Sequence, residues 1–234
     1  QSVHIDGISQ YESGINPDIT TELSLSLGEH LISVKSSLFS STAELGSYLY
    51  PLISDNLRKA VTKVYIGEAR LSGMSFHYFP NLRKVVYSTE ADSIYSNPFS
   101  ESAIRELYMP KNSSLLRLNS ALFKNCKMLK HLILPNISYI DDEAFAGCLS
   151  LDEIIIPATV TKFSGDNQFN GCISLRQIVF TSEIPPEISI TTFTGINPLC
   201  RIYVPDASVE AYKTANVWSS FANYIYPISE RGDE

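Results

Sequence analysis

A phenylalanine recurs every 22 to 24 residues along the middle of the chain, and this period constrains the fold more than any other feature. The recurring residues are Phe76, Phe99, Phe123, Phe145, Phe169 and Phe193. After each one the apolar residues follow the order L-x-x-L-x-L, and proline ends the run in four of the six copies. A unit this short cannot bury an apolar face alone, so successive units must stack. The sequence therefore predicts a repeat solenoid of about six repeats of 22–25 residues.

Each repeat is expected to contain one short strand. The last three positions of L-x-x-L-x-L alternate apolar, variable, apolar, as a strand does when one face packs in a core. Proline cannot donate to a strand ladder, so it marks where each strand ends. The spacing is that of a leucine-rich repeat, and we expect short parallel strands stacked from coil to coil.

The repeats also carry a more specific signature. Residues 144–163 closely match the pattern A-F-x-x-C-x-x-L-x-x-I-x-I-P-x-x-V-x-x-I. This resembles the BspA-like (Treponema pallidum-type) leucine-rich repeats of bacterial surface proteins, and the resemblance covers about residues 76–205. It implies an exported, non-catalytic surface protein used for adhesion or protein contacts. Phe79, Ser102 and Ile196 stand where the pattern has cysteine.

The repeats divide the chain into four predicted parts. These are an N-terminal segment with strands (1–40), an N-terminal cap (41–75), the leucine-rich repeats (76–205), and a C-terminal capping helix with a tail (206–234). Caps are needed because an open solenoid exposes its core and a strand edge.

Both flanks carry local signals of such caps. Residues 23–27 alternate like a half-buried strand, residues 41–44 have the form of a capping box, and residues 64–66 predict an extra strand. Near the other end Val209, Tyr212 and Ala215 recur at helical spacing, and residues 209–221 resemble the closing helix of BspA-like proteins. Asp206 or Ser208 is the expected N-cap of that helix.

Composition excludes several classes of protein. Apolar residues make up 44% of the chain and charged residues 18%, which is sufficient for a core. The formal net charge is −7, and an acidic chain is disfavoured as a nucleic-acid binder. No apolar run approaches about eighteen residues, so no transmembrane segment is expected.

The start of the chain predicts export. The chain begins with Gln1 rather than methionine, which is expected if a signal peptide has been removed. A chain trimmed in another way would begin the same way. With the resemblance, this predicts an extracellular or cell-surface bacterial protein associated with the outer membrane. A lipoprotein anchor upstream of Gln1 is one means of attachment. The triplet at residues 92–94 resembles an O-glycosylation site of Bacteroidetes, centred on Ser93.

The four cysteines follow the repeat rather than the spacing of a metal site. Cys126, Cys148, Cys172 and Cys200 form no C-x-x-C pair, which argues against zinc or thioredoxin-type chemistry. Equivalent positions in stacked coils point the same way, which favours a buried thiol ladder. Coils about 4.8 Å apart would also permit a disulfide between neighbours, and this alternative stays open. No metal or cofactor is predicted.

Signals for catalysis are weak. The histidines lie outside the repeat pattern, and no glycine-rich phosphate loop, G-x-S-x-G or H-E-x-x-H motif occurs. Carboxylates cluster at residues 141–143 and 152–153. If these clusters were functional, they would bind calcium or act as the carboxylate pair of a glycosidase. We favour a charge ladder, because Lys130, Asp152 and Arg176 occupy equivalent positions in consecutive repeats. The chain is therefore predicted not to be an enzyme.

The middle position of each strand is predicted to face outward and to form a partner-binding stripe. These positions are Tyr65, Val86, Tyr108, Ile133, Ile155, Val179 and Tyr203. A purely solvated face would carry threonine, lysine or glutamate, whereas here an apolar stripe runs for roughly 30 Å. Tyrosine is enriched at interfaces, which favours contact with a partner. Strand propensity alone, or coverage by the N-terminal segment, would explain the stripe equally well.

Three hypotheses for function follow. The favoured one is a secreted or surface-anchored monomer that binds a protein, such as one of the host extracellular matrix, or a glycan. The second is a carbohydrate-active enzyme on a parallel β-helix, which would need acidic residues around a cleft on one sheet face. The third is a structural display module between other surface domains.

Overall fold

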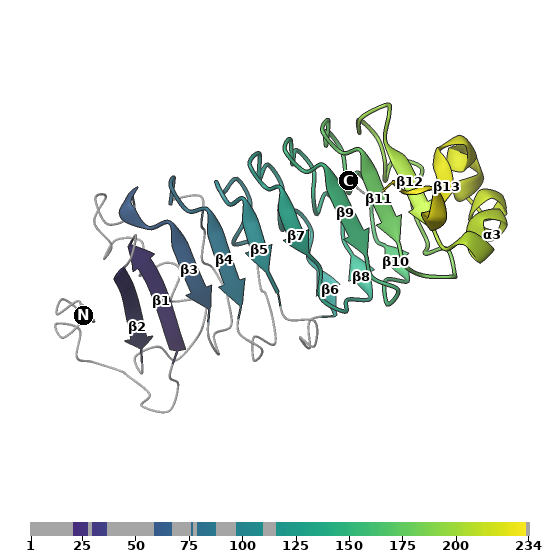
Figure 1. Cartoon of the computed structure of the whole chain (residues 1–234). Coiled ribbons are helices and arrows are strands. Elements are labelled where there is room, and N and C mark those ends of the chain that lie inside the picture. Colours follow the sequence, from purple (N-terminus) through teal and green to yellow (C-terminus); the bar gives the residue numbers. More distant parts are fainter. Residues whose placement is uncertain are drawn as a thin grey trace.

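The computed structural model describes residues 21–27, 30–36, 59–66, 76, 79–87, 97–109 and 116–232. Through these residues the chain winds into an elongated solenoid whose coils lie side by side (Figure 1). Strands of successive coils pair in parallel, in the register that the repeat alignment predicts. The predicted leucine-rich-repeat fold is confirmed.

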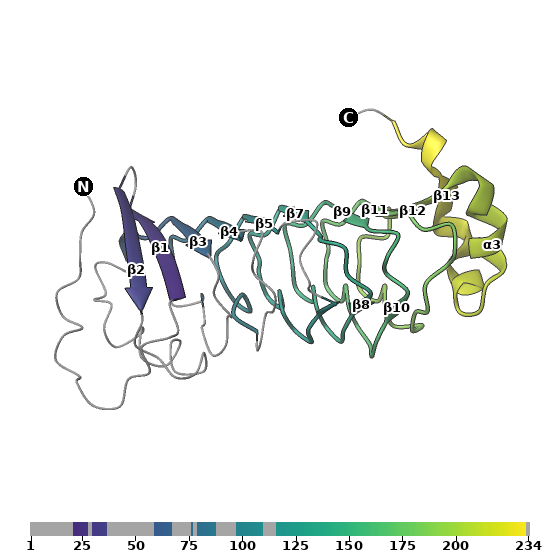
Figure 2. The same cartoon turned by 90° about the horizontal axis from the view of Figure 1, so that it is seen from below.

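One strand from each coil lies along one side of the solenoid (Figure 2). These strands are β3 (Lys63–Ile66), β4 (Lys84–Tyr87), β5 (Glu106–Tyr108), β7 (His131–Ile133), β9 (Glu153–Ile156), β11 (Gln177–Phe180), β12 (Arg201–Val204) and β13 (Ile225–Pro227). Hydrogen bonds join them in two parallel groups, β3-β4-β5-β7 and β9-β11-β12-β13. A smaller parallel sheet, in the order β10-β8-β6, consists of β6 (Arg117–Leu118), β8 (Tyr139–Ile140) and β10 (Lys162–Phe163).

A hairpin extends the sheet at its N-terminal end. It consists of β1 (Thr21–Leu27) and β2 (His30–Ser36), and β1 also pairs with β3 in antiparallel orientation. The predicted strands at residues 23–27 and 64–66 are therefore confirmed. The capping box at residues 41–44 lies outside the described residues, as does Ser93. The four-part division of the chain stays a prediction.

The repeated phenylalanines form one continuous column through the core. All six are buried, and neighbouring ring centroids lie 5.2–6.0 Å apart, with interplanar angles of 8–15°. Such aromatic pairs contribute about 0.5–1.5 kcal/mol beyond the area they bury. The column thus sets the spacing of the coils and holds them together along the solenoid axis.

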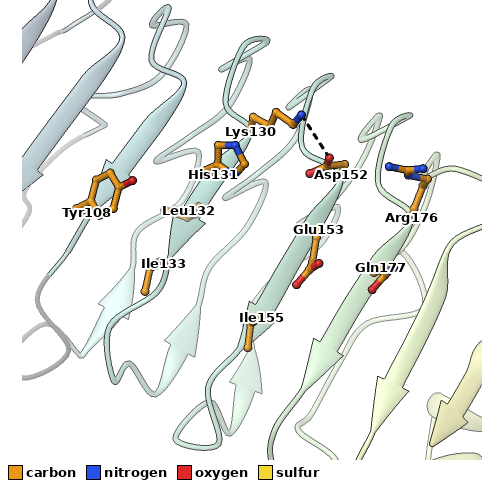
Figure 3. A pocket seen from close by; sticks show the side chains of 10 residues that line it. All are labelled: Tyr108, Lys130, His131, Leu132, Ile133, Asp152, Glu153, Ile155, Arg176 and Gln177. Carbon is orange, nitrogen blue, oxygen red and sulfur yellow. Dashed lines mark ion pairs between the residues drawn. The ribbon is translucent and has the colours of Figure 1, made fainter. Parts of the chain in front are cut away.

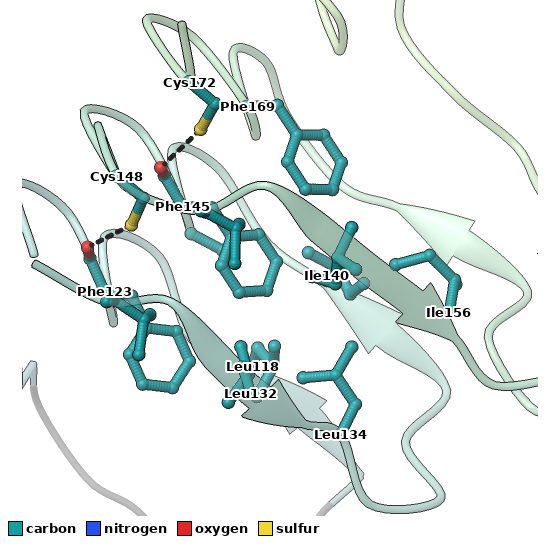
Figure 4. Close-up of a cluster of buried hydrophobic side chains, with 14 of the residues drawn as sticks. Leu118, Phe123, Leu132, Leu134, Ile140, Phe145, Cys148, Ile156, Phe169 and Cys172 are labelled. Carbon is teal, nitrogen blue, oxygen red and sulfur yellow. Dashed lines mark hydrogen bonds between the residues drawn. The ribbon is translucent and has the colours of Figure 1, made fainter. Parts of the chain in front are cut away.

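A second column consists of cysteine side chains. All four cysteines are free and buried, and in three of them the thiol reaches the phenylalanine carbonyl of the preceding coil. Figure 4 shows this contact for Cys148 and Cys172. Cys126 Sγ donates to Phe99 O at 2.8 Å, and Cys148 and Cys172 donate to Phe123 O and Phe145 O at 3.1 Å each. The cysteine of the repeat pattern therefore links backbones of successive coils.

The turn after each phenylalanine uses a left-handed backbone. The second residue after it has a φ of 59–75° in five coils: Glu101, Asn125, Gly147, Gly171 and Gly195. Only glycine adopts this region without steric cost, and asparagine tolerates it better than most residues. This explains the glycine that precedes cysteine in two repeats, Gly147-Cys148 and Gly171-Cys172.

The last repeat departs from the predicted alignment. Leu199 was aligned with the buried leucines of the earlier coils, but it is 82% exposed, whereas Cys200 is 2% exposed. Cys200 N–H donates to Asn197 O as Leu175 N–H donates to Cys172 O one coil earlier, so Cys200 occupies the leucine position. The alignment was wrong there because, compared with the preceding repeat, this one has one more residue between Phe193 and Cys200 and one fewer between Cys200 and Ile202. Cys200 is therefore not part of the cysteine column.

Two short helices close the C-terminal end of the core. They are α3 (Val209–Thr214) and the 3-10 helix η4 (Trp218–Tyr224), separated where Val217 has a φ of 64°. Trp218 Nε1 donates to Pro186 O at 2.8 Å, and Tyr212 Oη to Ser182 O at 3.0 Å. Trp218 and Phe221 meet Phe193 at interplanar angles of 57° and 89°, so the stacked column ends there.

The predicted closing helix is thus two helices. Ser208, one of the two residues predicted as N-cap, is the N-cap of α3. Its side chain, however, makes no capping hydrogen bond. Asp206 instead accepts a hydrogen bond from Ser229 N–H at 3.1 Å, so its carboxylate anchors the following segment rather than the helix. None of the helices in the described residues has the length and apolar character needed to cross a bilayer.

Replacing Phe145 tests the phenylalanine column. Phe145 is fully buried between Phe123 and Phe169, and Phe145→Ala should lower the free energy of unfolding by about 3–5 kcal/mol, because it removes two ring contacts and leaves a cavity. Chemical denaturation measures this loss. The control Ile173→Ala changes a side chain that is 62% exposed and should stay within about 0.5 kcal/mol of the parent. Equal stability of the two variants would contradict the column.

Thiol reactivity tests the cysteine column. Desolvation raises the pKa of Cys126, Cys172 and Cys200 to about 12 and that of Cys148 well above its usual range. Because only the thiolate reacts, the native protein at pH 8 should be nearly inert to a bulky thiol reagent. Four thiols should react after denaturation without reductant, and an added exposed cysteine, Ile173→Cys, should react at once. Two or fewer thiols after denaturation would mean that a disulfide exists.

Candidate partner-binding surface

The predicted stripe positions form a register-aligned row on the side of the sheet away from the core. Along the N-terminal strands Tyr65 pairs with Val86, Val86 with Tyr108 and Tyr108 with Ile133. In the second group Ile155 pairs with Val179, and Val179 with Tyr203. The side-chain placement of Tyr65 lies outside what the structure describes.

Among the positions whose side chains the structure describes, the row is most exposed over its middle coils. Tyr108, Ile133 and Ile155 are 38%, 51% and 46% exposed, and Val86 is half-buried. Val179 and Tyr203 are each only 3% exposed. The expectation that all seven residues form one open stripe is therefore wrong for Val179 and Tyr203. We call the three exposed residues Tyr108, Ile133 and Ile155 the outer stripe.

At the buried end of the row, β13 and the segment after it make contacts on the outer side of the sheet. After β13 the chain turns back on the outer side of the sheet, and residues 228–231 are called the cover segment here (Figure 2). Arg231 Nε donates to Gln177 Oε1 at 2.9 Å, and Arg231 Nη2 donates to Glu153 Oε1 at 2.7 Å. These bonds hold the segment across β11 and β9, while Tyr226 of β13 packs against Tyr203 with ring centroids 6.2 Å apart.

A shallow groove surrounds the outer stripe (Figure 3). Its volume is about 440 Å³, and it spans β5, β7, β9 and β11. The stripe residues form its apolar part. Its polar lining consists of Lys130, His131, Asp152, Glu153, Arg176 and Gln177. An apolar strip beside a row of mixed charges is the composition expected of a protein contact surface.

Charged side chains pair along the sheet. Lys84 Nζ lies 3.1 Å from Glu106 Oε2 and 4.2 Å from the ring centroid of Tyr108, whose hydroxyl donates to the same carboxylate at 3.3 Å. The hydrogen bond between Lys84 and Glu106 raises the pKa of Lys84 and lowers that of Glu106. These contacts orient the Tyr108 ring at one end of the groove.

The predicted charge ladder is present in part. Lys130 Nζ and Asp152 Oδ2 are 3.9 Å apart, a loose ion pair between exposed groups. Arg176 has no ion-pair partner among the described residues. The ladder therefore contributes little to stability, and its charges are available to a partner.

The acidic clusters have structural roles. Arg117 Nη1 lies 3.2 Å from Asp141 Oδ2, and Lys124 pairs with Glu143 at 2.5 Å. Asp142 Oδ1 accepts a hydrogen bond from Asp166 N–H at 2.8 Å, which ties two coils together. Across the part of the chain that the structure describes, no group of three His, Cys, Asp or Glu residues is arranged to hold a metal ion.

Comparison with protein families identifies the fold as that of one family. The model of the BspA type leucine rich repeat region matches in six copies, over residues 19–128, 61–176 and 138–222. The solenoid thus belongs to the leucine-rich-repeat class of proteins. Within that class, the chain is a member of the BspA-type leucine-rich repeat family.

Solved structures give distant likenesses. One is a leucine rich cell surface protein from Faecalibacterium prausnitzii A2-165, with 19% identity, a TM-score of 0.40, and coverage of 88% of this chain and 46% of that chain. Another is a leucine-rich repeat protein from Bacteroides ovatus ATCC 8483, with 16% identity, a TM-score of 0.37, and coverage of 63% and 55%. The chain spans about half the length of these proteins. Comparison with curated proteins finds no match.

Sequence reasoning missed the part of Arg231 in this surface. Arg231 is 54 residues from Gln177 and 78 from Glu153 along the chain, and it lies outside the repeat. No periodic pattern marks such a contact, so the sequence alone offers no signal for the cover segment.

Charge substitutions test which side of each strand is solvated. Tyr108→Asp with Ile155→Asp places two carboxylates on exposed positions and should leave the circular dichroism and the melting temperature nearly unchanged. Leu107→Asp or Ile154→Asp, one position earlier at 1% exposure, would bury an unpaired charge and should unfold the protein. Val179→Asp should also destabilise, because that position is only 3% exposed. Unfolding of the double variant would mean that the outer stripe is covered.

Proposed function

We propose that this chain is a non-enzymatic binding module of an exported or surface-anchored bacterial protein, and that it binds a protein partner on the outer face of its sheet. The observation that supports this proposal most is the outer stripe: three large apolar side chains, 38–51% exposed, line one groove on the middle strands of the solenoid. Exposed apolar groups that line up in a groove are typical of interaction sites.

The shape of the surface favours binding over catalysis. The groove is shallow and carries isoleucine and tyrosine where a β-helix enzyme would need acidic residues around a cleft. The two carboxylates that line it both pair with cations, Asp152 with Lys130 at 3.9 Å and Glu153 with Arg231 at 2.7 Å. A general acid–base pair would need carboxylates free to exchange protons with a substrate.

A protein partner fits the groove better than a glycan does. Branched aliphatic side chains at Ile133 and Ile155 offer no flat ring for sugar stacking, and only Tyr108 does. Mixed charges beside the apolar strip suit the polar rim of a protein interface. Adhesion to the host extracellular matrix is the role that family resemblance favours, and attachment to the cell by a lipid anchor agrees with such a role.

Binding assays on purified proteins test the proposal. Immobilised wild type is probed with a panel of purified host extracellular-matrix proteins and mucins, alongside the Tyr108→Asp/Ile155→Asp variant. A partner that uses the outer stripe should lose at least about tenfold in affinity, because the added charges must be desolvated on contact.

A matched control separates this effect from charge alone. Ile173→Asp with Ile184→Asp adds the same two charges at isoleucines that are 62% and 77% exposed and lie outside the groove. This control should bind like the wild type. A partner that binds the stripe variant and the wild type equally would move the binding surface elsewhere and contradict the proposal.

A further inference from the structure

The outer face of the sheet already holds one polypeptide segment, the chain's own cover segment. Its side-chain contact with the groove is Arg231, which donates to Gln177 Oε1 at 2.9 Å and to Glu153 Oε1 at 2.7 Å. Gln177 and Glu153 are directly opposite each other in the β9–β11 pairing, so their oxygens lie side by side on neighbouring strands. A guanidinium group presents several N–H donors in one plane and can bond both oxygens at once.

The cover segment is attached by few contacts, and these are exposed to solvent. The Arg231 and Glu153 side chains are 31% and 35% exposed, and ion pairs between such groups add little to stability. The other attachment is the Asp206 carboxylate, also exposed, which accepts hydrogen bonds from the backbone N–H groups of Ser229, at 3.1 Å, and Ile228. Segments with few buried contacts are the ones that open most readily in a folded protein.

Next to the bonds of Arg231, the apolar positions that continue the outer stripe are buried. Val179 and Tyr203 follow Ile155 in the register, yet each is 3% exposed, whereas Ile155 is 46% exposed. Displacement of Arg231 would therefore uncover Gln177 and Glu153 beside Ile155, while Tyr203 would stay packed against Tyr226 of β13. It would also leave the Glu153 carboxylate without its cation.

We infer that Glu153 and Gln177 form a subsite for a guanidinium group, and that the partner is a polypeptide segment whose arginine takes the place of Arg231. This inference rests on the proposed function, because it assigns the partner's chemistry on the same surface. Charge complementarity selects the occupant: Glu153 needs a cation once Arg231 leaves, and the paired oxygens suit arginine better than lysine. While Arg231 is in place it competes with the partner, which lowers the apparent affinity by the fraction of molecules that are closed.

Titration of a short peptide into the full chain tests this subsite. The probe is acetyl-Ser-Glu-Arg-Gly-amide, which carries the residues around Arg231, and the readout is the NMR amide shifts of Glu153, Gln177 and Val179. The Arg231→Ala variant should bind the peptide at least about fivefold more tightly than the wild type, because the subsite is vacant. The lysine peptide, acetyl-Ser-Glu-Lys-Gly-amide, should bind at least about fivefold more weakly than the arginine peptide.

Second-site variants check that the response comes from the subsite. Arg231→Ala with Glu153→Gln should lose most of the binding, whereas Arg231→Ala with Glu187→Gln, a carboxylate paired with Lys162 away from the groove, should retain it. Absence of shifts up to about 20 mM peptide, equal binding by wild type and Arg231→Ala, or equal binding of the two peptides would each overturn the inference. None of these results depends on the matrix-protein assay, so the inference can fail while the proposed function stands, and the reverse.

Discussion

The stacking of one phenylalanine per coil is the interaction on which the rest of the structure depends. Each ring packs nearly parallel to the next at 5.2–6.0 Å, so every coil is held by its two neighbours and by little else. The cysteine thiols repeat the same link beside the rings, from side chain to the backbone of the preceding coil. Because these columns set the register, residues at equal positions in the repeat come to lie in straight rows on the outer surface.

The features predicted correctly from the sequence are those that recur with the repeat. Tyr108 and Ile133 could be placed opposite each other because both hold the middle position of a strand, and the burial of Cys148 followed from its neighbours in the pattern. Errors arose where the period breaks. Leu199 was misplaced because the insertion before Cys200 and the deletion after it leave the length of the repeat unchanged. Arg231 was missed because its partners are distant in the sequence. Such contacts are set by three-dimensional packing that no local pattern encodes.

The candidate surface shows how a repeat can bear a specific site. The coils are nearly equivalent in the core, yet their outer positions differ in exposure, and β13 and the non-repeating segment after it make contacts at the buried end of the row. A uniform ladder would present the same surface at every coil and could not fix the register of a partner. The cover segment and the Lys84–Glu106–Tyr108 cluster mark the two ends of the groove and give it a defined length.

The perpendicular rings at the C-terminal cap have a consequence for assembly. A column of parallel rings is self-complementary, because its last face resembles the first face of another molecule. Phe221 meets Phe193 edge-on at 89°, and Trp218 meets it at 57°, so no parallel ring is left on which a second column could continue. At the same end of the solenoid the edge strand β13 has only three residues and finishes with Pro227, which lacks a donor. The C-terminal cap therefore prevents a second molecule from stacking end to end on this one, which would be the first step of fibre growth.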